Sequence, residues 1–337
     1  MKHYTIALLP GDGVGPELLE SACRVLRAAE QKAGTFSLTF IEYPFGESAY
    51  RELGAALPAD TLAGIEKSDA SLLGAVSVRG VPPPSPIGDM RRRLDLYADV
   101  RLIRARPGVW SLKEGIDIVC IRENTEGFLA DRSLYQGHGE WMPSADQALS
   151  LRVITRSKCE RIAEFAFEYA RRNRRRKVTA LHKAGVLKMG CGLFLEAVQS
   201  VAKGYPDIAF EDEYIDNAAN HLIAAPEDYD VILTTNLFGD IISDEAAALV
   251  SNIVPTVNIG RGIAVFLPVN HQHRSELAGL GTINPLPTLV CTELLFSHLG
   301  EHGAAEMVRR GLSSALKQGA LALKSTEAVT ALVCAGL

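Results

Sequence analysis

The chain has 337 residues, enough for two lobes or one large domain with a full hydrophobic core. Hydrophobic residues make up 47% of it, which excludes a disordered chain. The net charge of −5 comes from 35 basic and 40 acidic residues, so composition predicts neither a nucleic-acid nor a membrane partner. No apolar run approaches the ~20 residues of a membrane span. The first residues enter a strand directly, so we expect no signal peptide.

The predicted elements alternate between strands and helices, which indicates an α/β architecture. Polar residues recur at the C-terminal ends of the strands, where open α/β sheets bind ligands. The loop at 81–86 contains four prolines and is expected to be stiff and exposed. Strands are predicted at 5–9, 71–76, 117–121, 178–181 and 229–233, and helices at 17–33, at 240–250 and from the capping box Ser157-x-x-Glu160 to about Arg172.

The cysteines and the basic run at 171–177 suggest no separate function. The cysteines are scattered without a Cys-x-x-Cys pair, which is typical of reduced core thiols in a cytoplasmic protein rather than of disulfides or zinc. The basic run follows a helix, where positive charge is favourable, and contains no aromatic residue. We expect a solvated helix end rather than a nucleic-acid site.

The segment from Asn236 to Glu245 carries the most specific chemistry. A helix would place the carboxylates of Asp240 and Asp244 on one face, one turn apart. Such close like charges repel unless a cation lies between them, and Mg²⁺ or Mn²⁺ takes oxygen ligands. The alternative is a solvated helix start with acids placed to suit the helix dipole. Taken alone, the alternative is favoured, but other segments point to the same chemistry.

Two further segments are weaker signals of ligand binding. The loop from Gly11 to Gly15 follows a strand and opens a helix, but its G-x-G-x-G spacing departs from the dinucleotide fingerprint, so a tight structural turn is nearly as well supported. The guanidiniums of Arg91, Arg101 and Arg122 could hold a polycarboxylate through bidentate bonds. For any one of these arginines, an ordinary surface salt bridge is the alternative.

Five motifs in order identify a resemblance that no single motif carries. They are Gly-Asp-Gly-Val-Gly-Pro-Glu17, Arg-Arg-Arg-Leu-Asp-Leu-Tyr97, Arg-Glu-Asn-Thr-Glu-Gly127, His-Lys-Ala-Gly-Val-Leu-Lys188 and Asn-Leu-Phe-Gly-Asp-Ile-Ile-Ser-Asp-Glu245. From about residue 4 to 300 the chain resembles the isocitrate/isopropylmalate dehydrogenase family of β-decarboxylating dehydrogenases. The resemblance implies a two-lobed α/β fold with a large mixed sheet flanked by helices. Residues 1–101 plus 251–337 would form the nucleotide-binding lobe, and 102–250 the lobe with the metal site and dimer interface.

The resemblance implies metal- and NAD(P)-dependent oxidation of a small polycarboxylate 2-hydroxy acid, followed by loss of CO₂. The metal, Mg²⁺ or Mn²⁺, would be bound by Asp240 and Asp244 of one subunit and Asp216 of the other. Lys183 would reach in from the partner subunit as the base-side catalytic residue beside Asp216, which requires a homodimer. The malate carboxylates would be bound by Arg91, Arg101 and Arg122.

The cofactor side also follows from the resemblance, with a divergent adenine loop from Leu267 to Gly279 that is one residue longer than the family's. Glu276 falls where NAD-dependent members carry an acid that accepts the ribose hydroxyls, which favours NAD, while Arg274 argues mildly for NADP. The family histidine is replaced by Asn270, with His271 and His273 as candidate substitutes. The remaining expected cofactor contacts are Gly11, Gly13 and Asn284.

Two other departures concern the chemistry. Leu129 stands where the family carries the tyrosine that protonates the enolate carbon, leaving Tyr135 or water as candidate donors. Gly185 stands where the family has an asparagine near the nicotinamide. In the loop that selects the substrate, Ser85 matches the isocitrate pattern, whereas Ile87 and its neighbour do not, so the substituent on the malate stays open.

The expected function is therefore NAD-linked oxidative decarboxylation of a 3-substituted malate. A dehydrogenase that does not complete decarboxylation is a second interpretation, and a non-catalytic regulatory subunit of a homologous enzyme is a third. The metal and base residues favour an enzyme, while Leu129 and Gly185 favour the regulatory subunit.

Overall fold

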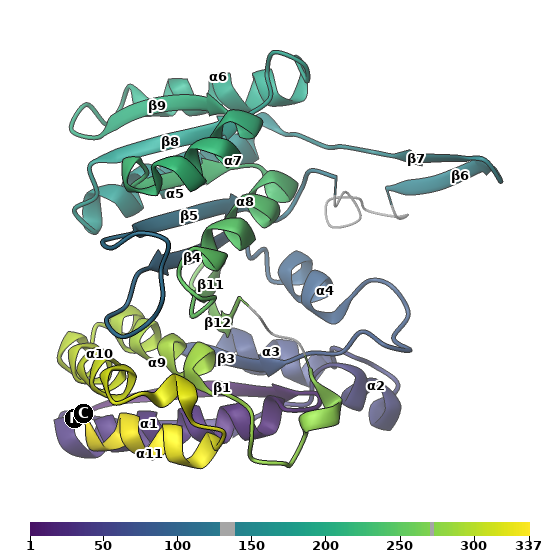
Figure 1. Cartoon of the computed structure of the whole chain (residues 1–337). Helices are drawn as coiled ribbons and strands as arrows, with labels where there is room; N and C mark the ends of the chain where they lie inside the picture. Colours follow the sequence, from purple (N-terminus) through teal and green to yellow (C-terminus); the bar gives the residue numbers. More distant parts are fainter. Residues whose placement is uncertain (129–138, 270–272) are drawn as a thin grey trace.

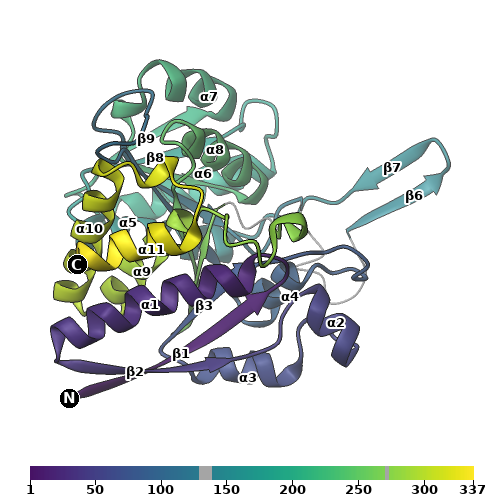
Figure 2. The ribbon, with the colours of Figure 1, turned by 60° about the horizontal axis from the view of Figure 1, so that its bottom comes forward.

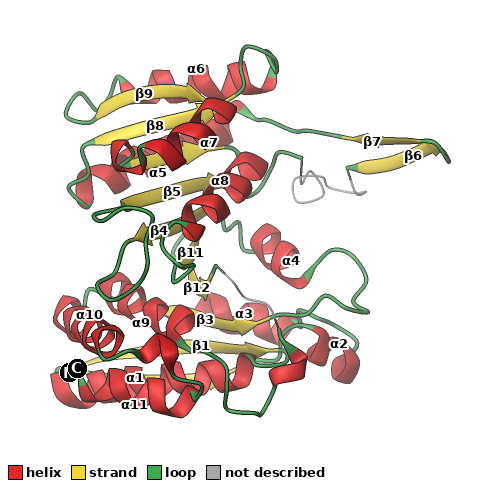
Figure 3. Cartoon of the chain, in the orientation of Figure 1, coloured by secondary structure: helices red, strands yellow, loops and turns green. Residues whose placement is uncertain are grey.

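The computed structural model describes residues 1–128, 139–269 and 273–337, and its core is one mixed sheet of ten strands. Figure 1 shows this sheet extending through the molecule, and Figure 3 shows helices on both of its faces. The order across the sheet is β2 (Phe36–Glu42), β1 (Lys2–Gly11), β3 (Ala70–Ala75), β12 (Ala264–Pro268), β11 (Pro255–Ile259), β4 (Ala98–Arg104), β5 (Asp117–Glu123), β10 (Val231–Thr234), β8 (Lys177–His182) and β9 (Ala209–Tyr214).

Antiparallel pairing is confined to the middle of the sheet. Strand β11 is antiparallel to β12 and β4, and β4 is antiparallel to β5, whereas the other neighbours pair in parallel. The expected α/β fold with a large mixed sheet is confirmed. The predicted division into two lobes stays a prediction, and its boundary between residues 101 and 102 falls within β4.

The inner strands of the sheet, such as β3, β10 and β12, are buried on both faces, as expected of strands covered by helices. In β1, Ile6 and Leu8 join the core under α1, and Leu9 faces the opposite core with α3. One face is covered by α1 (Gly15–Ala33), α5 (Arg156–Arg172), α6 (Gly190–Ala202), α9 (Leu286–His298), α10 (His302–Lys317) and α11 (Thr326–Ala335). The other is covered by α3 (Ala59–Lys67), α4 (Pro86–Arg93), α7 (Ile215–Ala224) and α8 (Asn236–Ala248).

The remaining elements lie at the edges. Helix α2 (Glu47–Leu53) follows β2, and a two-stranded hairpin, β6 (Glu140–Ser144) with β7 (Gln147–Ser150), projects from the body of the molecule (Figures 1 and 2). Both hairpin strands are exposed along their whole length. Short 3₁₀ turns occupy Pro226–Asp228, Ser275–Leu277 and Ala320–Ala322. None of the helices in the described ranges combines the length and apolarity that a membrane crossing requires.

Helix α8 begins four residues earlier than predicted, at Asn236. Gly239 weakens the helical pattern in the sequence, but a Cβ there would lie 2.7 Å from the Cβ of Arg122, so the missing side chain lets the helix approach β5. Asp240 and Asp244 therefore lie beyond the first turn. The alternative interpretation of these acids as a helix start is wrong.

Two other local predictions need correction. The Ser157 capping box does not open α5, because the N-cap is Thr155 and it makes no side-chain cap bond. The basic run after this helix is only partly solvated: Arg175 forms ion pairs with Asp117 and Asp230, tying the helix end to the sheet. The cysteines in the described ranges are unbridged, as predicted, and four of the six are buried.

Candidate active site

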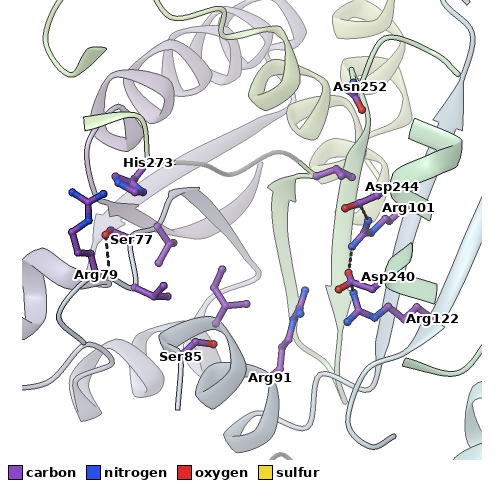
Figure 4. A pocket seen from close by; sticks show the side chains of 14 residues that line it. Ser77, Arg79, Ser85, Arg91, Arg101, Arg122, Asp240, Asp244, Asn252 and His273 are labelled. Carbon is purple, nitrogen blue, oxygen red and sulfur yellow. Dashed lines mark hydrogen bonds and ion pairs between the residues drawn. The ribbon is translucent and has the colours of Figure 1, made fainter. Parts of the chain in front are cut away.

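A cavity of about 800 Å³ brings together most of the predicted substrate and metal residues. Figure 4 shows three arginines and two aspartates gathered on one side of it, with Ser77, Arg79 and His273 across from them. Its lining consists of Val76, Ser77, Val78, Arg79, Ser85, Ile87, Arg91, Arg101, Arg122, Asp240, Asp244, Asn252, Val269 and His273.

The three arginines come from different elements and are fixed by buried partners. Arg91 lies on α4 and donates from Nε to Oδ1 of Asn258 at 2.7 Å. Arg122, near the end of β5, donates from Nε and Nη2 to Oδ1 of Asn236 at 2.9 and 2.6 Å. Arg101 lies within β4, and each of the three arginines is at least nine-tenths buried. Several guanidiniums thus converge on the pocket from rigid strands and helices, an arrangement suited to binding carboxylates.

A carboxylate lies beneath this cluster. Asp99 is completely buried, and its Oδ2 lies 3.6 Å from Arg91, 3.6 Å from Arg101 and 3.5 Å from Arg122. Its Oδ1 accepts the hydroxyl of Thr256. Burial alone would raise the pKa of the Asp99 carboxyl, but the three arginines and the Thr256 hydroxyl lower it to about 2, so it is ionised.

The two aspartates of α8 face the same arginines. Arg101 forms ion pairs with Asp240, at 3.0 Å, and with Asp244, and Arg122 also pairs with Asp240. The side chains of Asp240 and Asp244 are 44% and 65% exposed, so both carboxylates are accessible from the cavity. Their carboxylate oxygens, one helical turn apart, are ligands of the kind that a hard divalent cation prefers.

Lys183 and Asp216, the other predicted catalytic residues, form an ion pair with each other. Lys183 Nζ also lies 5.1 Å from the ring centre of Tyr214. Neither is among the described residues that line the cavity. Among the described residues of one chain, no group of three His, Cys, Asp or Glu side chains could hold a metal ion. One chain thus contains two separate halves of the predicted site.

The glycine loop between β1 and α1 packs tightly against other backbone. A Cβ at Gly11 would lie 2.0 Å from the carbonyl oxygen of Ala75, and one at Gly13 would lie 1.9 Å from that of His273. Both have positive φ values, 70° and 58°. The loop is anchored by Asp12, whose carboxylate accepts backbone N–H groups from Glu47, Ser48 and Ser77. The glycines therefore serve a tight turn, whether or not a nucleotide also approaches them.

The loop predicted to bind adenine lies against this turn. The carbonyl of His273 accepts the Val14 N–H at 2.9 Å, and its side chain lines the cavity. Glu276 is exposed on the 3₁₀ turn that follows. Asn284 accepts the Leu286 N–H through Oδ1 at 3.0 Å, just before α9. His271 lies outside the described residues, as do Leu129 and Tyr135.

The predicted Ser85 is the N-cap of α4 and lines the cavity, with its Oγ accepting the Gly88 N–H at 3.1 Å. At Gly185, a Cβ would lie 2.6 Å from the hydroxyl oxygen of Tyr214, so that ring occupies the space next to the missing side chain.

The buried residues that hold the arginines in place, Asp99, Asn236 and Asn258, were not predicted from the sequence. Asp99 and Arg101 are two residues apart in one strand, so strand alternation places both side chains on one face, and this was the available signal. Asn236 and Asn258 gave no such signal, because their roles depend on contacts with Arg122 and Arg91 from distant parts of the chain.

Comparison with known proteins decides the family. The isocitrate/isopropylmalate dehydrogenase family matches residues 5–332. A 3-isopropylmalate dehydrogenase of Methanothermobacter thermautotrophicus is 38% identical over 95% of this chain and 92% of its own length. An isocitrate/homoisocitrate dehydrogenase of Thermus thermophilus is 37% identical over 94% and 92%. The crystal structure of isocitrate dehydrogenase from Methylococcus capsulatus superposes with a TM-score of 0.88 at 33% identity, covering 98% of this chain and 99% of that one.

The chain belongs to the isocitrate/isopropylmalate dehydrogenase family. It is an oxidoreductase of the decarboxylating hydroxyacid dehydrogenase class. The relatives named for different malates are almost equally similar, at 37–40% identity, so overall similarity does not select the substrate.

Proposed function

We propose that this dehydrogenase carries out metal-dependent, NAD-linked oxidative decarboxylation of a 3-substituted malate. The observation that carries the proposal is the convergence of Arg91, Arg101 and Arg122 on a cavity that also contains Asp240 and Asp244. Guanidiniums bind the two malate carboxylates, and the paired aspartates supply oxygen ligands beside them. The relatives' names, which cover isopropylmalate, homoisocitrate and isocitrate, agree with this substrate class.

The residues of this chain would have separate roles in the reaction. The arginines orient the malate, and Lys183 with Asp216 accepts the proton of the 2-hydroxyl. Asp240 and Asp244, with Asp216 of the partner subunit, would hold Mg²⁺ or Mn²⁺. When bound, the metal would polarise the hydroxyl as a Lewis acid and the nicotinamide would accept the hydride.

The proposal includes a homodimer because the two halves of the proposed site lie apart within one chain. Asp240 and Asp244 offer two ligands, and the described residues add no third acid beside them. Lys183 and Asp216 lie together away from the cavity and are 27% and 59% exposed. Two copies related by a twofold axis would each offer the pair to the other's cavity.

NAD is the proposed cofactor. Three residues before Glu276, the carbonyl of His273 accepts the Val14 N–H, and the His273 side chain lines the cavity. The turn with Glu276 therefore adjoins the glycine loop. An exposed carboxylate there can accept ribose hydroxyls and repels a 2′-phosphate.

We also propose a cytoplasmic location, because the unbridged cysteines are typical of a reducing compartment.

The test is a panel of malates with isopropyl, carboxymethyl, carboxyethyl and methyl groups at C3, plus unsubstituted malate, assayed with Mn²⁺ and NAD. NADH release and CO₂ release are followed together. We expect one substituent to give both products. A catalytically silent protein that still binds a malate would instead favour the regulatory subunit.

A further inference from the structure

The buried Asp99 has no place in the chemistry proposed above, yet it contacts all three of the predicted substrate-binding arginines, Arg91, Arg101 and Arg122. Among the buried acids of the described residues, Asp99 is the one with no exposed surface, and its Oδ2 accepts no hydrogen bond from a described residue. That oxygen instead lies 3.5–3.6 Å from a guanidinium nitrogen of each of these three arginines. A buried charge is costly to desolvate, so its retention here calls for a reason.

The strand pairing explains how one side chain reaches all three arginines. In β4, Asp99 lies directly opposite Arg122 of β5 and Asn258 of β11. Arg101 is two residues along the same strand, and Arg91 is bound to Asn258. The carboxylate therefore stands on the sheet beneath the guanidiniums, while Asp240 and Asp244 contact Arg101 and Arg122 from α8.

The two sets of carboxylates differ in what they can do once ligands bind. Asp240 and Asp244 are open to the cavity and would turn to a metal, leaving Arg101 and Arg122 without those partners. Asp99 is enclosed, so it keeps its position. It also balances charge, because three guanidiniums face three carboxylates in this cluster.

We propose that Asp99 is a positioning residue that holds the three guanidiniums in their substrate-binding geometry and offsets one of their charges. This role of Asp99 rests on the proposed function, which supplies the substrate that the arginines would bind. Removing the charge leaves the cluster with an uncompensated positive charge, which should strengthen attraction for a dianion. It also loosens the guanidiniums, and a misplaced substrate reacts slowly even when it is bound.

The test is Asp99→Asn, which keeps the size of the side chain. We expect kcat on the best malate to fall by at least roughly tenfold, because the substrate is held out of position. Calorimetry with unsubstituted malate, without metal or cofactor, should show binding about threefold tighter at low salt and a steeper loss of affinity with NaCl. A purely structural residue would produce neither tighter binding nor a steeper salt dependence.

The matched control is Asp230→Asn, which also removes a carboxylate paired with an arginine, Arg175, but neither residue lines the cavity. It should leave kcat, KM and malate binding unchanged. Wild-type kcat in Asp99→Asn, or weaker malate binding with an unchanged salt dependence, would overturn the proposal. If the wild type oxidises no malate, the proposed function fails, but the calorimetry still decides the role of Asp99.

A second variant covers the case in which Asp99→Asn does not fold. Thr256→Val keeps a β-branched residue in β11 but removes the hydroxyl that donates to Asp99. The carboxylate keeps its charge and loses its orientation, so kcat should fall by about threefold with KM unchanged. Wild-type kcat in a folded Thr256→Val protein, alongside an unfolded Asp99→Asn, would also overturn the proposal.

Discussion

The two halves of the proposed site differ in how completely one chain builds them. The arginine half is assembled from α4, β4, β5 and α8, and the side chains of its arginines are less than one-tenth exposed. The half with Lys183 and Asp216 is more exposed, and those two side chains pair with each other. A site residue supported by several elements has a fixed geometry, whereas an exposed ion pair contributes little to stability and exchanges partners easily. In the proposed homodimer, the partner subunit would complete the second half.

The largest expected effect tests whether the second half is completed at the partner's cavity. Lys183→Met removes the base-side residue and should lower kcat by about 10²–10⁴-fold. Asp240→Asn should lower kcat to a similar extent, because it removes a proposed metal ligand. If the halves meet across subunits, hybrids of the two variants contain one intact site. Random mixing after joint refolding should then restore about a quarter of the wild-type activity.

The control for this experiment mixes Lys183→Met with Arg122→Ala, which lies in the arginine half like Asp240 and should complement equally well. Asp240→Asn mixed with Arg122→Ala should recover nothing, because both lesions then fall in the same half. Full inactivity of every mixture would place the two halves of a working site in one chain.

The next prediction concerns the metal. Asp240→Asn removes a charged ligand from the arginine half, so Mn²⁺ affinity should fall by more than the roughly 10–100-fold expected for loss of a supporting residue. Titration calorimetry of each purified protein with Mn²⁺ measures this affinity. Asp207→Asn is the control, since Asp207 pairs only with Arg171 at the surface in the described contacts and should bind Mn²⁺ normally. Equal affinity in both variants would contradict the assignment.

The same contrast explains what could be predicted from sequence. The fold followed from alternating apolar runs and ordered motifs, since parallel strands buried on both faces leave a clear pattern. The arginines and aspartates that line the cavity could be predicted because their motifs carry the chemistry. The start of α8 was predicted four residues too late, because helix propensity says nothing of the close approach of Gly239 to Arg122. Asp99 was missed because its importance arises from three arginines that only the folded sheet brings to it.

A smaller effect is expected from the missing proton donor. Leu129 cannot protonate the enolate carbon, so oxidation should outpace formation of the protonated product, or the new C–H bond should lose its stereochemistry. Leu129→Tyr should raise the rate of product formation by up to roughly 10²-fold. The measurement is the ratio of NADH to decarboxylated product, with deuterium incorporation at the protonated carbon.

Leu129→Phe is the control, because it adds the ring without the hydroxyl and should not raise the rate. One-to-one coupling with a single stereochemistry in the wild type would mean that another donor already serves, with Tyr135 the first candidate. Tyr135→Phe would then uncouple the two products.

The smallest effect concerns the cofactor side of the cavity, opposite the arginines. Glu276 is exposed on a turn next to the glycine loop, so its carboxylate should accept ribose hydroxyls and repel a 2′-phosphate. Removing that charge with Glu276→Gln should lower the ratio of kcat/KM for NAD to that for NADP by about tenfold, equivalent to about 1.4 kcal/mol. Glu114→Gln, an exposed glutamate in a loop elsewhere, should leave the ratio unchanged. Arg274→Gln should move it the other way, because a guanidinium beside the ribose would attract the 2′-phosphate. A wild-type preference for NADP that Arg274→Gln abolishes would show that Arg274, rather than Glu276, faces the ribose, and the arginine half would then stay as described while the cofactor half changed.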